Sequence, residues 1–149
     1  MPLCHPMLDS LRRIDHPGLI LFTTGTTGKQ KAILHDFLPF IRRYDTSRPP
    51  LKALRLLLFD HIGGLNTLLH ILFNQGHVIS IFDRSVNALI DAINEYSVEL
   101  LSATLGFLRL LSLYPDIKNK ISKTVKIISY GTELVDKPTL DRLCNQFHI

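Results

Sequence analysis

The sequence predicts an α/β fold in which a mainly parallel sheet is flanked by helices. Short apolar runs alternate along the chain with longer segments of helical periodicity. The segments between the apolar runs hold about ten residues or more, which is the length that a parallel crossover requires. The chain has 149 residues, of which 46% are hydrophobic and 20% charged, as is typical of one globular domain or of part of a larger one.

Apolar runs are expected to form the strands of this sheet. The first of them, GLILFT at 18–23, lies between His16-Pro17 and a loop of glycines and threonines. The predicted strands are 18–23, 53–59, 77–82, 98–101 and 125–129. Ligands bind at the carboxyl ends of the strands in such sheets, so the loops after Phe22 and Ser129 are the first places to look for a site.

The segments between the strands carry apolar residues at helical spacing. In 65–75 the leucines fall on one face, and Gly76 is expected to end the helix. In 32–44 a kink is expected at Pro39. Residues 1–16 are expected to form an irregular lead-in to a domain that spans 17–149. The predicted helices are 32–44, 65–75, 86–96, 105–113 and 137–147.

Charge and composition exclude several classes of protein. The formal net charge is +4, but the basic residues are scattered without interleaved aromatic side chains, so nucleic acid is not an expected partner. No apolar run approaches the roughly 20 residues of a membrane span, and the N-terminus lacks a signal-peptide pattern. Cys4 and Cys144 lie near opposite ends, and the histidines lack metal-ligand spacing, so no metal site is expected in this chain. A cytoplasmic protein with small anionic ligands is favoured.

The segment TTGTTGKQK at 23–31 is the most informative part of the sequence. Its glycines permit close approach of a ligand to the backbone, its threonines offer hydroxyl groups, and its last lysine suits phosphate. Followed by a helix, such a loop would bind an anion through backbone N–H groups. It is not a Walker A loop, because only two residues separate its glycines. A flexible turn is the simpler alternative. The predicted phosphate-binding residues are Thr23, Thr24, Gly25, Thr26, Thr27, Gly28 and Lys31.

This segment resembles the phosphate-binding loop of the adenylate-forming enzymes, which include acyl-CoA synthetases, luciferase-like enzymes and peptide-synthetase adenylation domains. The family pattern is two hydroxyl or small residues, Gly, two hydroxyl residues, Gly, any residue, usually Pro, and Lys. Gln30 stands where the family usually has Pro, and the other positions fit. The resemblance covers 17–147 and implies the central part of the large AMP-binding domain of acyl-CoA synthetase type.

Two further stretches resemble segments of the same family, in the same order. The stretch FDHIGGLN at 59–66 resembles one that lines the acyl-substrate pocket, which implies that role for His61, Gly63 and Gly64. For the histidine alone, a residue at a helix start without a binding role is the alternative. The stretch SYGTEL at 129–134 resembles one that passes along the adenine, which implies that Gly131, Thr132 and Glu133 flank this base.

The resemblance implies an ATP-dependent enzyme that activates a carboxylic acid as an acyl-adenylate and then transfers it to a thiol. An acid–CoA ligase is the preferred type, with ATP, Mg²⁺ and CoA as cofactors and co-substrates and a small carboxylic acid as substrate. Lys31 would stabilise phosphate charge, and no other residue is assigned a catalytic role. The sequence identifies neither the acid nor whether the acceptor thiol belongs to CoA or to a carrier protein.

The magnesium-binding Glu, the ribose-binding Asp and the catalytic Lys of the family have no counterpart in this sequence. The domain is therefore expected to be truncated at both ends, and this chain alone to be inactive, with the metal ligand and the remainder of the ligase outside it. Two alternatives stay open. One is a non-catalytic fragment that at most binds nucleotide, and the other is an unrelated phosphate-binding α/β module.

Overall fold

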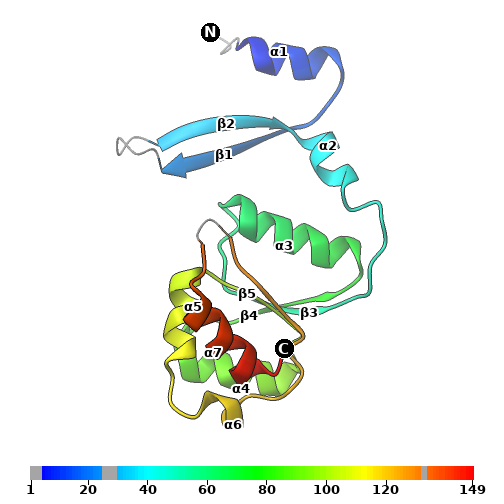
Figure 1. Ribbon diagram of the computed structural model, residues 1–149. Coiled ribbons are helices and arrows are strands. Elements are labelled where there is room, and N and C mark those ends of the chain that lie inside the picture. The colour runs from blue at the N-terminus through cyan, green and yellow to red at the C-terminus, as the bar shows by residue number, and fades with distance from the viewer. Residues whose placement is uncertain (1–4, 25–29, 132–133) are drawn as a thin grey trace.

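A four-stranded parallel sheet and a separate antiparallel hairpin form the framework of the protein (Figure 1). The computed structural model describes residues 5–24, 30–131 and 134–149. In chain order the elements are α1 (Pro6–Arg13), β1 (Gly18–Thr24), β2 (Gln30–Asp36), α2 (Phe37–Arg42), β3 (Lys52–Arg55), α3 (Ile62–Phe73), β4 (His77–Ser80), α4 (Val86–Tyr96), β5 (Leu100–Ser102), α5 (Leu105–Ser112), α6 (Ile117–Lys120), β6 (Ile127–Ser129) and α7 (Lys137–Phe147).

The parallel sheet has the strand order β4-β3-β5-β6. All three of its strand pairs are parallel, so every connection within it is a crossover that contains at least one helix. The carboxyl ends of the four strands therefore meet at one edge of the sheet. This arrangement confirms the predicted α/β class with a mainly parallel sheet flanked by helices.

Helices cover both faces of the sheet. On one face, Ala53 and Leu100 pack with Ile71 of α3. On the other face, Leu54 and Leu101 belong to the larger apolar cluster, to which α4, α5 and α7 contribute. Alternate residues of a strand point to opposite faces, which explains why neighbours in β3 and β5 join different clusters. Figure 1 shows α3 between the sheet and the hairpin.

The hairpin corrects the prediction of a helix over 32–44. Residues 30–36 form β2, which pairs antiparallel with β1 from Gly18↔Asp36 to Thr24↔Gln30. Only the six residues of α2 are helical in the predicted segment, and Pro39 lies in its first turn, where a missing N–H costs little. The first strand is thus confirmed, but it belongs to the hairpin and not to the parallel sheet. A short apolar run such as AIL is compatible with either helix or strand, and pairing with β1 decides between them.

The N-terminal segment is also more regular than the sequence suggested. Residues 6–13 form α1, with Pro6 at its start, so 1–16 is not an irregular lead-in throughout. A Cβ on Gly18 would lie 3.0 Å from Leu34 Cδ1 and 3.1 Å from Leu11 Cδ1, which places α1 against the base of the hairpin.

The remaining predicted elements are present, with shifted ends. Helices α4 and α7 have the predicted bounds, whereas β3 ends at Arg55 and the predicted strand continued to residue 59. The short helix α6 was not predicted. The left-handed residue after α3 is Gln75, with φ 57°, and not the predicted stop Gly76. Within the described ranges, no helix combines the length and apolar character needed to cross a bilayer.

Candidate functional site

The open end of the hairpin carries the described part of the predicted phosphate-binding segment. Thr23 of β1 lies directly opposite Lys31 of β2, and both side chains are exposed. Residues directly opposite in an antiparallel pair have their Cβ atoms about 5 Å apart and point to the same face. Thr24 lies in β1 opposite Gln30. Gly25, Thr26, Thr27 and Gly28 lie outside the described residues.

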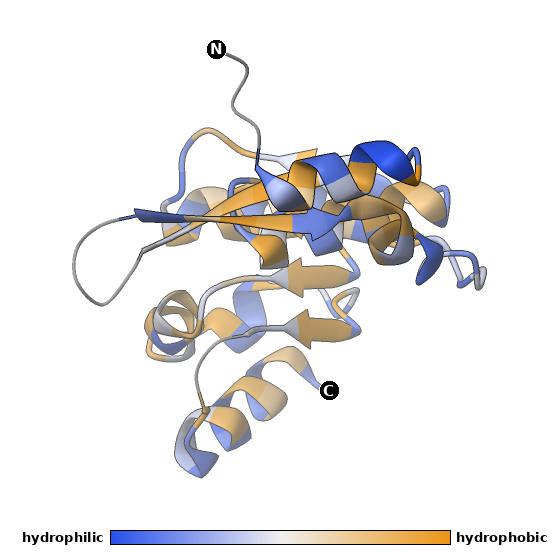
Figure 2. Cartoon of the chain, turned by 90° about the horizontal axis from the view of Figure 1, so that it is seen from above, coloured by the Kyte–Doolittle hydropathy of each residue, from blue (hydrophilic) through white to orange (hydrophobic). Residues whose placement is uncertain are grey.

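This geometry joins a hydroxyl group and an ammonium group on one face of a two-stranded ribbon. Both groups donate hydrogen bonds, and the ammonium adds a positive charge, so the pair suits a phosphate oxygen. Figure 2 shows the hairpin apolar along its middle and hydrophilic near its open end. One expectation is corrected: a strand, and not a helix, follows the loop, so no helix N-terminus directly after it adds positive charge to this site.

The start of α3 holds the three residues predicted for the acyl pocket. His61 is the N-cap residue with extended backbone angles, and Gly63 and Gly64 lie in the first helical turn. A Cβ on Gly64 would lie 1.9 Å from the carbonyl oxygen of Leu58, so only glycine fits there. A Cβ on Gly63 would lie 3.5 Å from Leu57 Cδ1, an ordinary contact. The two glycines therefore differ: Gly64 is required for packing, whereas the position of Gly63 has room for a Cβ.

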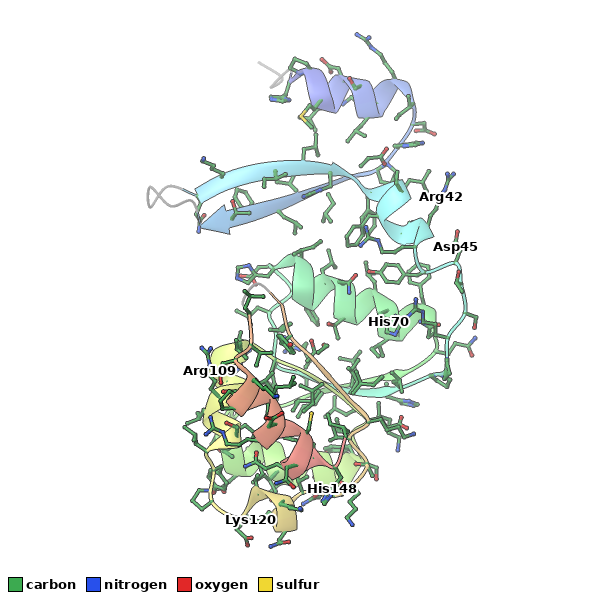
Figure 3. All side chains as sticks on the ribbon, in the orientation of Figure 1. Arg42, Asp45, His70, Arg109, Lys120 and His148 are labelled. Atoms are coloured by element: carbon green, nitrogen blue, oxygen red, sulfur yellow. The ribbon has the colours of Figure 1, made fainter. Side chains whose placement is uncertain are left out.

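One histidine is the N-cap of α3 and another lies within the helix, and the two have different surroundings. The His61 side chain is 62% exposed, and its Nε2 lies 3.9 Å from Oδ1 of Asp60, which is a loose contact. His70 lies in the last turn of the helix, at the other end, as Figure 3 shows. Burial lowers the pKa of His70, and the nearby charge of Arg48 lowers it further. Only His61 is thus placed at the carboxyl edge of the sheet with an accessible imidazole.

The segment after β6 carries the residues predicted to flank the adenine. Gly131 is exposed, and no described residue would lie within 4 Å of a Cβ placed on it. Thr132 and Glu133 lie outside the described residues. Since β5 separates β3 from β6, the ends of these two strands are about 10 Å apart, or two strand spacings. The chain segments that follow β3 and β6 thus leave the same edge of the sheet within reach of one small ligand.

A row of polar residues at this edge was not predicted. The last residues of the four strands lie in register with their neighbours and so share the face that α3 covers: Ser80, Arg55, Ser102 and Ser129. Ser102 is 2% exposed, and its hydroxyl lies 3.1 Å from that of Thr67 in α3. The available signal was that each strand ends in a polar residue, but the register that aligns them is set by tertiary packing.

Two concave regions border the sheet. A cavity of about 10 Å³ lies between α3 and the strand ends, lined by Arg55, Phe59, Gly64, Thr67 and Ser102 together with apolar residues. A wider groove of about 770 Å³ runs along the outer strand β4 beside α4 and contains none of the predicted site residues. The narrow cavity is therefore the one connected with the predicted acyl-pocket residues.

Across the described ranges, no group of three or more His, Cys, Asp or Glu side chains is arranged to hold a metal ion.

Sequence and structure comparisons give different results. No protein-family model and no curated protein sequence matches this chain. Solved structures do match: an amide bond synthetase from Marinactinospora thermotolerans has a TM-score of 0.73 at 18% identity over 85% of this chain and 26% of its own. A luciferase-like enzyme from the mealworm Zophobas morio has a TM-score of 0.74 at 17% identity over 87% of this chain and 31% of its own.

A third structure is the O-succinylbenzoate coenzyme A synthetase of Bacillus subtilis in complex with AMP. Its TM-score is 0.66 at 22% identity, over 85% of this chain and 33% of its own. The chain thus spans about a quarter to a third of the solved structures it matches. These three are the kinds of enzyme that the sequence resemblance indicated, and the chain accordingly has the fold of a part of the large domain of adenylate-forming enzymes.

Proposed function

We propose that this chain supplies the phosphate-binding segment and part of the acyl and adenine sites for the ATP-dependent activation of a carboxylic acid. The observation that carries the proposal is the cross-strand pair of Thr23 and Lys31 at the open end of the hairpin. The likeness to a synthetase structure that contains AMP supports it.

The first reaction step explains why this pair matters. A carboxylate oxygen of the substrate attacks the α-phosphorus of ATP, a new P–O bond forms, and the bond to the β-phosphate oxygen breaks to release pyrophosphate. Negative charge builds up on the departing pyrophosphate, so donors fixed in advance lower the barrier. In this proposal the Lys31 ammonium and the Thr23 hydroxyl, which lie opposite each other in the hairpin, are such donors for the β- and γ-phosphates. Thr24, Gly25, Thr26, Thr27 and Gly28 are proposed to complete this site.

The acid and the adenine are assigned to the carboxyl edge of the parallel sheet. His61, Gly63 and Gly64 at the start of α3 border the acyl group, and the exposed imidazole is free to contact it. Gly131, Thr132 and Glu133 flank the adenine. The open space around Gly131 favours a flat ring lying against the backbone there.

The second step is proposed to be attack of a thiol on the acyl carbonyl carbon, which forms a thioester and releases AMP. CoA is the proposed acceptor, and the thiol of a carrier protein is the alternative acceptor. Mg²⁺ would be held by the ATP phosphates and by a carboxylate outside this chain, and it would neutralise phosphate charge. No described residue is assigned to it.

Pyrophosphate binding tests the proposal directly. In calorimetric titration of the 149-residue chain, we expect pyrophosphate to bind and Lys31→Ala to weaken binding by at least about tenfold, which is roughly the value of a charge-assisted hydrogen bond. Lys120→Ala is the matched control, because Lys120 lies over the ring of Tyr114, in the region of α6. Absence of pyrophosphate binding, or equal affinity in Lys31→Ala, would contradict the proposal.

Pyrophosphate exchange into ATP distinguishes a chain that only binds phosphate from one that catalyses the first reaction step. We propose that this chain alone does not catalyse acid-dependent exchange, because it lacks counterparts of the family's magnesium-binding Glu and catalytic Lys. Binding without exchange fits a chain that contributes one part of the enzyme, and equally a non-catalytic nucleotide-binding protein. Exchange that requires Lys31 would show that the residues present suffice for the first step.

A further inference from the structure

The polar row at the carboxyl edge of the sheet contains one charged side chain, that of Arg55. Its Nε and Nη2 atoms donate to the hydroxyl of Ser80 at 3.3 and 2.8 Å, and the guanidinium lies 4.6 Å from the centre of the Phe59 ring. No carboxylate of a described residue lies within ion-pair distance of it, and its Nη1 group makes no hydrogen bond to that part of the chain. This half-buried positive charge is therefore held in place by neutral partners only.

The surroundings of Arg55 limit what can bind there. The cavity beside it has a volume of about 10 Å³, which is room for about one water molecule and not for an acyl chain or a ring. Thr67 and Ser102 line the same cavity, but their hydroxyl groups are already engaged: that of Thr67 donates to the carbonyl oxygen of Gly63 at 2.9 Å and lies 3.1 Å from that of Ser102. A guanidinium presents a planar set of donors that matches a carboxylate, and among the described residues that line the cavity Arg55 alone provides such donors. A small oxyanion head group would thus be bound by the guanidinium of Arg55 and not inside the cavity.

Arg55 is also placed next to the residues assigned to the acyl pocket. Gly64 lines the cavity together with Arg55, and His61 follows β3 in the same loop. We infer that Arg55 binds a second carboxylate of the substrate, remote from the one that is activated, and so selects dicarboxylic acids. This inference rests on the proposed function, since it names the substrate class of the same site.

Binding of paired acids tests the inference without requiring activity. Glutarate and valerate have the same chain length but differ in the second carboxylate. In calorimetric titration of the 149-residue chain, we expect glutarate to bind about tenfold more tightly than valerate, which corresponds to one charge-assisted hydrogen-bonded contact. Arg55→Gln should remove this preference, and Arg55→Lys should keep only part of it, because an ammonium lacks the planar pair of donors.

Arg43→Gln is the matched control for this experiment. The Arg43 guanidinium also lies over a phenylalanine ring, at 4.5 Å from the centre of Phe40, but it follows α2 and is not at the carboxyl edge of the parallel sheet. The Arg43→Gln substitution should leave the glutarate preference unchanged. Thermal unfolding of each variant establishes that it is folded, and Arg55→Lys serves if the glutamine variant is not.

The outcomes also separate this inference from the proposed function. Equal affinity for the two acids, no measurable glutarate binding, or a preference that survives in Arg55→Gln would overturn the inference. If pyrophosphate still binds in a manner that requires Lys31, the proposed function stands without it. The chain could instead prefer glutarate in a manner that requires Arg55 but fail to bind pyrophosphate. That result would support a carboxylate site at Arg55 and contradict the proposed function.

Discussion

Thr23 and Lys31 face each other across the hairpin, one at the end of β1 and the other near the start of β2. Seven residues separate them in the sequence, 24–30, yet the antiparallel register places their side chains on the same face. A helix in place of β2 would direct Lys31 by helical geometry and not by this register. The pairing gives the predicted phosphate contact a geometry that single substitutions can test.

Removal of the Thr23 hydroxyl should weaken phosphate binding while leaving the hairpin intact. Thr23→Val keeps the shape and the β-branched side chain that favours a strand. A lost hydrogen bond to a charged group costs about 1.5 to 3 kcal/mol, so pyrophosphate affinity should fall roughly ten- to a hundredfold. The Thr23→Ser variant keeps a hydroxyl group, so it should bind pyrophosphate with nearly the affinity of the wild type. Equal affinities of the valine and serine variants in calorimetry would contradict a role for the hydroxyl.

The two glycines at the start of α3 should respond differently to alanine. Gly64→Ala should destabilise the protein by about 3 kcal/mol or more, because the Cβ would lie 1.9 Å from a backbone oxygen that has little room to move. Gly63→Ala makes only an ordinary contact at 3.5 Å and gains helix propensity, so the free energy of unfolding should change by less than about 1 kcal/mol. Urea unfolding of both variants measures this difference.

A third glycine provides a positive control for the same experiment. No described residue would lie within 4 Å of a Cβ on Gly106, which lies in the first turn of α5. Gly106→Ala should raise the free energy of unfolding by about 0.5 to 1 kcal/mol. Similar losses in Gly63→Ala and Gly64→Ala would show that the contact with Leu58 is not what distinguishes them.

Local signals account for the parts of the fold that the sequence predicted correctly. Helix α4 begins after Ser85, whose side chain accepts a hydrogen bond from the N–H of Ala88, and α7 begins after Asp136, which caps it in the same way. These capping residues precede clear helical periodicity, so the bounds of both helices could be predicted. The resemblance of 23–31 to a phosphate-binding loop rests on the same kind of local pattern, and its phosphate-binding role stays a prediction.

The errors arise where distant segments decide the structure. Residues 32–36 are a strand because they pair with β1, and nothing local distinguishes them from a helix. The alignment of Arg55 with Ser80 and Ser102 depends on the register of strands that whole helices separate in the sequence. A sequence pattern can mark each strand end as polar, but it does not show which of these ends become neighbours.

Glu99 should stabilise the sheet in a pH-dependent manner. Its carboxylate accepts from the Lys126 ammonium at 2.6 Å and from the backbone N–H of Lys52 at 3.1 Å, so it joins the amino ends of β3 and β6. The hydrogen bond from Lys126 holds the pKa of Glu99 below its usual value of 4.5, although partial burial opposes this shift. Because the pKa of Glu99 is lower in the folded than in the unfolded state, the stabilisation is present above pH 4.5. It is lost as the pH falls through the lowered pKa of the folded state.

The test is the difference in stability between wild type and Glu99→Gln. At neutral pH the variant should be about 1 kcal/mol less stable, because both partners remain partly exposed. The difference should narrow as the pH falls below about 4.5, where the wild-type carboxylate becomes protonated. Asp91→Asn, an exposed carboxylate of α4, should show no such narrowing. A constant difference down to pH 3 would contradict the assignment.

Asp36 should hold the hairpin and α2 together through two separate contacts. One carboxylate oxygen accepts from Nδ1 of His16 at 2.7 Å, and the other caps α2 by accepting from the N–H of Leu38 at 3.1 Å. The His16 hydrogen bond is the main reason that the pKa of Asp36 is lowered from its usual value of 3.8. The contribution of this carboxylate is therefore present above pH 3.8 and is lost as the pH falls below it.

Two substitutions separate these contacts. Asparagine is as good a helix cap as aspartate but carries no charge, so Asp36→Asn should keep the contact with Leu38 and weaken the one with His16. Asp36→Ala removes both. Hydrogen exchange of the β1 and β2 amides at neutral pH should therefore quicken slightly in the asparagine variant and more strongly in the alanine variant. If the two variants exchange alike, the cap on α2 contributes nothing to the hairpin, and the contact with His16 alone stabilises its base.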